Sequence, residues 1–163
     1  MSNLLDRISE LEQQLASLKA EAEKEKKENK RWRADESCLY WFVQSNGIPN
    51  CTYEYHRDID NFCYDTHNYF QTEEEARRYA KVLETERQLK KFADEHNDVI
   101  DWSNINQEKW YLYYNYSCYK VGISSHYWAK ESRVIYFSSK KIAQQAIDTI
   151  GEDKIKEYLT YEW

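Results

Sequence analysis

Two cysteines and two histidines lie close together in the first half of the chain, and these are residue types that bind zinc. They follow the spacing Cys-x4-His-x6-Cys-x3-His, and the four residues are Cys51, His56, Cys63 and His67. This spacing can reach a tetrahedral zinc ion, but structural zinc sites commonly use closer cysteine pairs. Small buried thiols and histidines at the edge of a hairpin are the alternative. We therefore expect no bound metal and no cofactor, and keep these four residues as the candidate zinc set.

Other residues that carry enzyme chemistry do not form a recognisable signature. The pair Asp58-x-Asp60 lacks the glycine and the final glutamate of a calcium-binding loop, so it is interpreted as surface acidity. The chain has only three glycines, which argues against a glycine-rich phosphate loop. No motif orders a cysteine with a histidine as nucleophile and base. We therefore predict that the protein is not an enzyme.

The composition indicates a folded protein whose charge is unevenly distributed. Of the 163 residues, 41% are hydrophobic and 16% are aromatic, which is enough to form a core. The net charge is −6, and residues 1–34, 35–100 and 101–163 contribute +1, −7 and 0. This balance argues against nucleic acid as a partner, because phosphate binding needs clustered Lys and Arg. It favours a basic protein surface instead.

The sequence lacks the features of export and of membrane insertion. It has no run of about 18 apolar residues, and its N-terminus lacks the charged and apolar regions of a signal peptide. The four cysteines include no Cys-x-x-Cys pair, which favours free thiols in a reducing compartment. We therefore expect a cytoplasmic protein without a membrane partner.

The first 34 residues have the spacing of a coiled coil. Core positions recur alternately every four and three residues, and they are occupied by Leu4, Ile8, Leu11, Leu15, Leu18, Ala22 and, further on, Asn29. In a parallel pair Arg7 faces Glu12 and Glu21 faces Lys26, which are attractive pairs. Segment 1–34 is therefore predicted to be an oligomerisation helix, with a parallel dimer favoured. An amphipathic helix folded onto the protein's own body is the alternative.

The sequence pattern of the second segment, residues 35–98, predicts a hairpin, a short strand and a helix. Asn46-Gly47 lies between two apolar runs and predicts a hairpin of Leu39–Gln44 against Ile48–Tyr55. A polar stretch over residues 57–65 and a short strand at His67–Phe70 follow. Thr72 and Glu75 then form a capping box, which predicts a helix that continues to about His96.

The third segment, residues 99–163, repeats this plan. Strands are expected at Trp110–Tyr114, Tyr119–Ile123 and Arg133–Phe137. Ser139 is the expected cap of a helix that ends at Gly151, and a last short helix follows. The phrase NYFQTEEEA at residues 68–76 returns as IYFSSKKIA at residues 135–143. The predicted fold class is therefore α+β, with an N-terminal coiled-coil helix followed by two tandem β-hairpin, strand and helix units.

Acidic and aromatic residues are the candidates for partner binding. Tyr111 and Tyr113 alternate with Trp110, Leu112 and Tyr114, so both faces of one strand are aromatic. One face must pack on the helices, and the other forms an interface between units or copies, or a recognition surface, which includes a stacking platform for a nucleotide. The complete candidate set is Tyr40, Asp58, Asp60, Glu73, Glu74, Glu75, Tyr111 and Tyr113.

An ordered set of short motifs runs through the chain. It comprises Trp32-Arg33-Ala34, Tyr40-Trp41-Phe42, Asp58–Asn61, Asn68–Ala76, Trp102-Ser103-Asn104, Lys109-Trp110-Tyr111, Tyr136–Ala143 and Ile150-Gly151. In this order the motifs resemble a family of small uncharacterised proteins from tailed phages and prophages of Gram-positive bacteria, over about residues 30–160. The loop around Cys51–Tyr64 departs from the usual pattern of that family. The resemblance implies a phage gene product that works in the cytoplasm of a bacterial host, and it assigns no catalytic residue.

These observations predict a phage-encoded, non-enzymatic effector. It is expected to oligomerise through its coiled coil and to bind a host protein, such as a component of an anti-phage defence system. One alternative is a sponge that sequesters a nucleotide immune signal in an aromatic pocket. Another is a structural or assembly factor of the phage.

Overall fold

The computed structural model describes residues 31–162 and, in the N-terminal segment, residues 7–8, 11–12, 14–15 and 18–19. Contacts divide the chain into two units, Met1–Arg33 and Ala34–Trp163. The second unit is called the body below, and its described residues form four helices and two small antiparallel sheets. The predicted α+β fold class is therefore confirmed.

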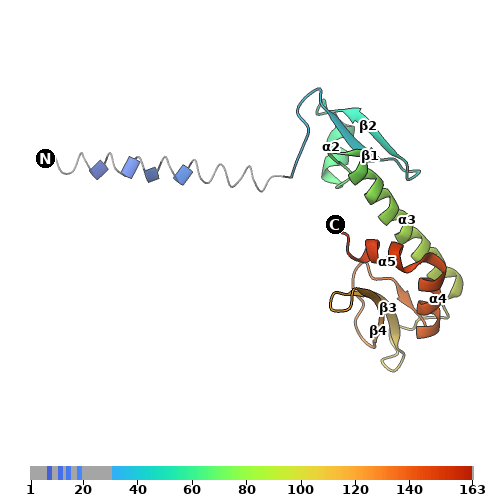
Figure 1. Ribbon diagram of the computed structural model, residues 1–163. Helices are drawn as coiled ribbons and strands as arrows, with labels where there is room; N and C mark the ends of the chain where they lie inside the picture. The colour runs from blue at the N-terminus through green and yellow to red at the C-terminus, as the bar shows by residue number, and fades with distance from the viewer. Residues whose placement is uncertain (1–6, 9–10, 13, 16–17, 20–30, 163) are drawn as a thin grey trace. The chain divides into compact units, whose positions relative to one another are not determined.

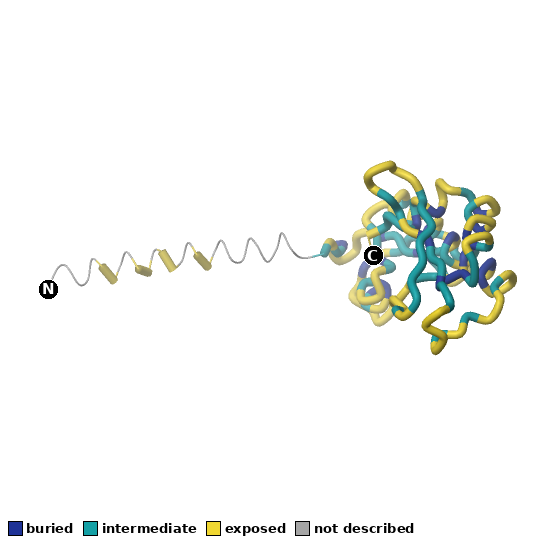
Figure 2. Tube along the Cα trace, turned by 90° about the horizontal axis from the view of Figure 1, so that it is seen from below, coloured by how far each residue is buried: buried dark blue, intermediate teal, exposed yellow. Residues whose placement is uncertain are grey.

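The described residues of the N-terminal segment are helical and exposed. Four of them are core positions of the predicted heptad, and their exposed fractions lie between 47% and 62%; they are Ile8, Leu11, Leu15 and Leu18. Figure 2 colours the described parts of this segment as exposed. Leu4, Ala22 and Asn29 lie outside the described residues. The coiled coil therefore stays a prediction.

The first sheet consists of the predicted hairpin and one further residue that bridges to it. Strands β1 (Leu39–Val43) and β2 (Pro49–Tyr53) pair antiparallel, and the turn between them places Gly47 at φ +83°. On the other side of β1, Phe70 and Trp41 exchange two backbone hydrogen bonds of 2.8 Å. The predicted strand His67–Phe70 is thus reduced to one bridging residue, since His67 has a positive φ of 61°.

The polar stretch after β2 is a helix, although its sequence pattern did not predict one. Helix α2 spans Asp58–Asp65, and its two buried residues are Asp60 and Cys63. Its apolar residues Ile59 and Phe62 point to solvent. The apolar stripe that normally indicates a helix is therefore absent from its inner side.

Helix α3 (Glu73–His96) is the longest element of the body and has the predicted bounds. The Thr72 hydroxyl accepts the Glu75 N–H at 3.2 Å, and the Glu75 carboxylate accepts the Thr72 N–H at 3.1 Å, which completes the capping box. Along its length α3 contacts β1 and β2 as well as helices α4 (Lys140–Ile150) and α5 (Glu152–Leu159). Figure 1 shows α3 running from the first hairpin to the C-terminal helices.

The second sheet has the strand order β4-β3-β5. Strand β3 (Lys109–Asn115) lies between β4 (Lys120–His126) and β5 (Tyr136–Phe137). The predicted strand from Arg133 is shortened because Arg133 has φ +66°, which is incompatible with a strand. Tyr119, at φ +58°, belongs to the turn and not to β4. Ser139 caps α4 through the Ile142 N–H, and α4 ends at Gly151, both as predicted. Gly151 has a positive φ of 101°, but its ψ of 132° differs from the left-handed helical cap that was expected.

One asparagine side chain in each half completes a sheet edge. The Asn68 side chain accepts the Val43 N–H and donates to the Val43 carbonyl, each at 2.7 Å. The Asn97 side chain donates to the Tyr136 carbonyl at 2.8 Å and accepts the Ser138 N–H at 2.9 Å. Each amide therefore replaces a neighbouring strand at that point of the edge.

The largest apolar core lies where α3 meets the second sheet, α4 and α5. Its buried members are Val82, Leu89, Phe92, Ala93, Leu112, Phe137, Ala143, Ala146, Ile150, Ile155 and Tyr158. A smaller cluster beneath the first sheet contains Ala34, Tyr40, Cys63 and Tyr69. The first cluster is almost wholly apolar, whereas the second contains two tyrosines and a thiol. Buried polar side chains are therefore found mainly beneath the first sheet.

Candidate functional site

The four candidate zinc ligands are not brought together. Cys51 is half-buried on β2, Cys63 is buried on α2, and His56 and His67 are exposed. Within the described part of the chain, no group of three or more His, Cys, Asp or Glu side chains is placed to hold a metal ion. The nearest acidic partner of His56 is the Glu54 carboxylate, 3.5 Å from its Nδ1.

The most concentrated set of polar side chains is the buried network beneath the first sheet. The Tyr40 hydroxyl donates to Oδ1 of Asp60 at 2.9 Å, and both residues have an exposed fraction of 0%. Oδ2 of Asp60 also accepts the N–H groups of Tyr55 and Arg57 and the Arg57 Nε at 3.0 to 3.1 Å. The interpretation of Tyr40 and Asp60 as surface residues for a partner was therefore wrong, because Asp60 is the internal acceptor for the whole turn before α2.

The same contacts determine the charge state of Asp60. Burial alone would raise the pKa of this carboxyl, but hydrogen bonds from Arg57, Tyr40 and two backbone N–H groups hold its pKa at about 2. Burial and the hydrogen bond to Asp60 raise the pKa of Tyr40. Asp60 is therefore an ionised acceptor and Tyr40 a neutral donor at physiological pH.

A second relay lies beside the first and holds the start of the body. The Tyr69 hydroxyl accepts the Ala34 N–H at 3.2 Å and donates to Oε2 of Glu54 at 2.7 Å. Oε1 of Glu54, which is completely buried, accepts the His56 N–H at 2.6 Å. The rings of Tyr40 and Tyr69 stack with centroids 3.9 Å apart and planes at 11°, so the two relays form one assembly.

Cys63 is the only described thiol that is fully buried, and it lies in this assembly. Burial raises its pKa, although the hydrogen bond with Tyr40 acts in the opposite direction. A nucleophilic cysteine needs a lowered pKa and access to a substrate, and Cys63 has neither. Cys63 therefore lacks the features of an activated nucleophile, and the network supports the shape of the first half.

The acidic candidates at the start of α3 are partly used by the helix itself. Glu75 completes the capping box, and Glu73 forms an ion pair with Arg77 one turn later. Glu74 is exposed, as is Asp58 at the start of α2. Asp58 and Glu74 are therefore the members of the acidic set whose side chains are most open to a partner.

The aromatic residues of β3 divide between the two faces of the second sheet. Leu112 lies in the main core and Trp110 packs against it. On the opposite face Tyr113 is 38% exposed and lies over Gly122, where any Cβ would come within 2.5 Å of its ring. Tyr111 is half-buried on that face, with its ring 5.1 Å from that of His126. Tyr113 is therefore the more accessible of the two candidates.

A buried lysine on this outer face was missed from the sequence. The Lys109 side chain is 0% exposed, and its Nζ donates to the carbonyls of Asn104 at 2.6 Å and Tyr127 at 3.0 Å. It also lies 5.8 Å from the centre of the Trp102 ring. Opposite Lys109, Nε2 of His126 is buried and finds no hydrogen-bond partner among the described residues. The Lys109 side chain links two loops over the outer face. In the alternation of the strand, Lys109 falls on the same face as Tyr111, and this position was the one signal in the sequence that could have indicated its role.

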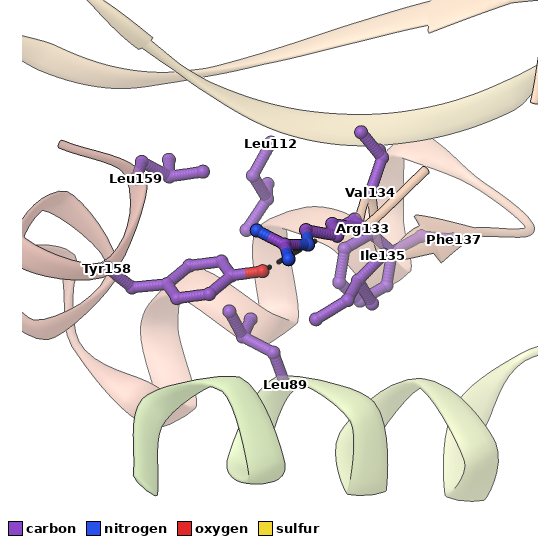
Figure 3. Close-up of a pocket in the computed structure, with 8 residues that line it drawn as sticks. All are labelled: Leu89, Leu112, Arg133, Val134, Ile135, Phe137, Tyr158 and Leu159. Carbon is purple, nitrogen blue, oxygen red and sulfur yellow. Dashed lines mark hydrogen bonds between the residues drawn. The ribbon is translucent and has the colours of Figure 1, made fainter. Parts of the chain in front are cut away.

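A small hollow lies in the main core between α3, α5 and the segment before β5. Its volume is about 60 Å³, and Figure 3 shows the eight residues that line it. The Tyr158 hydroxyl donates to the Arg133 carbonyl at its edge over 3.4 Å, and burial raises the pKa of Tyr158 to about 12. Pockets for small molecules usually measure ~300–1,000 Å³. This hollow is therefore too small for a nucleotide.

No model of a known family, no curated protein and no solved structure matches the chain. Among the helices in the described part, none is both long and apolar enough to cross a membrane. The body is thus an α+β unit with a structural polar network. The residues that are accessible as candidates for partner binding lie on its surface.

Proposed function

We propose that this chain is a non-enzymatic protein-binding effector that self-associates through residues 1–34. In this proposal the body presents two tandem units, residues 35–98 and 99–163, to a protein of the host. The parallel coiled coil supplies avidity, because linked binding sites remain near their targets after one of them dissociates.

The observation that carries this proposal is the apolar seam that the heptad positions form on a helical segment. Ile8, Leu11, Leu15 and Leu18 are helical and between 47% and 62% exposed. Four apolar side chains on one seam of a helix are normally buried against a second helix. A second copy of the chain is the partner that such a seam fits best.

The tandem arrangement is supported by equivalent positions in the two sheets. Phe70 pairs with Trp41 in the first sheet, and Phe137 pairs with Trp110 in the second. Two residues after each phenylalanine, Thr72 and Ser139 accept the N–H of the third helical residue. The same strand pairing is therefore followed by the same helix cap in both halves.

The cellular context of the proposal comes from the sequence resemblance to phage and prophage proteins. A phage protein in the host cytoplasm that binds a host protein fits a role against bacterial defence systems. The core hollow, at about 60 Å³, is too small to be the nucleotide pocket of a sponge. An assembly factor of the phage remains the second alternative, and it would bind a phage protein instead.

Light scattering on the full-length chain tests the self-association. We expect a dimer that becomes a monomer when Leu11→Gln and Leu18→Gln are combined, because both changes place amides in the seam. Val99→Gln is the matched control, since Val99 is an 85% exposed apolar residue of the body. A mass that is the same for the wild type and the double variant would contradict the proposal.

Mass spectrometry of proteins that co-purify from infected host cells tests the second part. The expected partner is a host protein that is recovered with the wild type and depleted with the monomeric double variant, because avidity is lost. Recovery of phage capsid or tail proteins alone would support the assembly factor. A nucleotide that leaves on denaturation, detected by absorbance at 260 nm, would support the sponge.

A further inference from the structure

The stretch from Ala34 to Ala76 is almost free of basic residues. It contains nine Asp and Glu residues, and Arg57 is its single Arg or Lys. Arg57 is already committed, because its Nε and Nη2 donate to the buried Asp60 at 3.1 and 3.2 Å. The exposed charged side chains within this stretch are therefore mostly carboxylates, including Asp35, Glu36 and Asp58.

Large apolar side chains are exposed within the same stretch. Six of them have exposed fractions from 47% to 62%. Ile48 lies in the turn of the hairpin, and the other five belong to the strands of the hairpin, the turn after it and α2: Leu39, Tyr53, Tyr55, Ile59 and Phe62. We call these five residues, together with the exposed carboxylates Asp35, Glu36 and Asp58, the acidic-aromatic surface. Isolated exposed apolar residues are common, but a group of five in one part of a fold is typical of an interaction site.

The five side chains form two groups, one on the hairpin and the turn after it and one on α2. Leu39 and Tyr53 lie directly opposite each other in the register of β1 and β2. The rings of Tyr53 and Tyr55 are 6.5 Å apart. Ile59 and Phe62 are three residues apart on α2 and therefore share a face of that helix. Figure 1 shows α2 beside the hairpin.

Arg57 holds the turn between the hairpin and α2 in place. Its Nη2 donates to the Tyr53 carbonyl at 3.1 Å, and its guanidinium lies 5.2 Å from the centre of the Tyr55 ring. Together with its bonds to Asp60, these contacts orient the hairpin end and the start of α2 relative to each other. The acidic-aromatic surface is therefore preorganised, which lowers the entropic cost of binding.

We propose that the acidic-aromatic surface docks a partner protein whose contact surface combines apolar side chains with Lys and Arg. This inference rests on the proposed function and specifies its binding site. Charge selects the occupant: phosphates of nucleic acid and a second copy of the same acidic stretch are both repelled, whereas a basic surface is attracted. The apolar members supply the burial that holds the complex together.

Fluorescence anisotropy with the full-length protein tests this inference. The probe is a fluorescein-labelled 16-residue peptide in which Lys and Leu alternate, and its counterpart has Glu in place of Lys. A single-stranded DNA 16-mer is the third probe. We expect the Lys peptide alone to bind, with an affinity that falls several-fold as NaCl is raised from low to high concentration.

Paired variants then locate the binding surface. Ile59→Gln combined with Phe62→Gln is expected to weaken binding of the Lys peptide at least tenfold, because both side chains are central apolar contacts. The matched control is Tyr116→Gln with Trp128→Gln, which removes two aromatic residues of the second half that are 70% and 79% exposed. This control is expected to change the affinity by less than twofold. All four residues are exposed, so the variants should fold as the wild type does.

Each outcome decides for or against the inference. Equal binding of the Glu peptide or of DNA, or an unchanged affinity in the Ile59 and Phe62 variant, overturns it. Light scattering on the same samples separates this result from the proposed self-association. A monomer that binds the Lys peptide through Ile59 and Phe62 keeps the surface and refutes the coiled coil, and a dimer that does not bind refutes the surface alone.

Discussion

The two sheets of the body share one arrangement of strands but differ in what is buried beneath them. In each sheet a hairpin strand is paired on its other side by a phenylalanine that is followed by a capped helix. The second sheet covers an apolar core, whereas the first covers the hydrogen-bonded assembly of Tyr40, Asp60, Tyr69 and Glu54. One backbone plan can thus be stabilised either by apolar packing or by a satisfied polar network.

The largest expected effect comes from removing the equivalent phenylalanines. Phe137 is fully buried in the main core, so Phe137→Ala should lower the free energy of unfolding by about 3–5 kcal/mol. Phe70 is only half-buried and contacts Tyr79, so Phe70→Ala should cost less than half as much. Urea denaturation of the two variants measures the difference. Equal losses would show that the two sheets depend equally on apolar packing.

The next effect tests the polar network through its charge. Asp60→Asn leaves the shape but removes the ionised acceptor, and we expect a loss of about 2–3 kcal/mol near neutral pH. The folded-state pKa of Asp60, about 2, is below its ordinary value of 3.8, so its contribution is present above about pH 4. That contribution is lost as the pH falls through about 2.

Urea denaturation at pH 6 and at pH 3 therefore provides the check for Asp60. The difference between the wild type and Asp60→Asn should be larger at pH 6 than at pH 3. Asp148→Asn is the matched control, because Asp148 is exposed on α4. A difference that does not change with pH would mean that Asp60 is not an ionised internal acceptor.

A smaller effect compares the two asparagines at the sheet edges. Asn68→Ala and Asn97→Ala each remove two hydrogen bonds to strand backbone and should each cost about 1–2 kcal/mol. Asn50→Ala, at an exposed position of β2, is the control. Hydrogen exchange at the Val43 and Ser138 amides should increase selectively in the corresponding variant. Unchanged exchange would contradict the role of these side chains as substitutes for a strand.

The smallest effect concerns the charges at the two equivalent helix starts. Helix α3 begins with Glu73-Glu74-Glu75, whereas α4 begins with Lys140 and Lys141, where positive charge opposes the helix dipole. Lys141→Glu should therefore stabilise the protein by about 0.3–1 kcal/mol at low salt, and Glu74→Lys should destabilise it by a similar amount. Thermal unfolding at two salt concentrations measures both. Shifts of the same sign would contradict the dipole explanation.

Local signals in the sequence predicted much of this fold. Asn46-Gly47, the Thr72 capping box, Ser139 and Gly151 each act within a few residues, and each lies where it was expected. Helix α2 was missed because its inner side carries Asp60 and Cys63 and its outer side carries Ile59 and Phe62. Apolar periodicity assumes the opposite arrangement.

The candidate site was less predictable than the fold. Tyr40 and Asp60 were expected on the surface, and their burial depends on a hydrogen bond between residues 20 positions apart. Arg133 was expected in a strand, and its positive φ has no local signal in the sequence. Burial of a polar residue requires knowledge of its partner, which only the folded chain supplies.

Helix α3 has a consequence for any attempt to divide the protein. Helix α3 has 24 residues, and along its length it contacts first the hairpin and then α4 and α5. A fragment that ends near residue 98 would keep α3 but leave Val82, Leu89 and Phe92 uncovered, and such surfaces aggregate. The complementary fragment would lack one wall of its core. Residues 34–162 should therefore be kept together in gene fusions and expression trials, and we expect evolution to exchange them as one part. The chain between the two sheets suggests a domain boundary, but a cut there would divide the core.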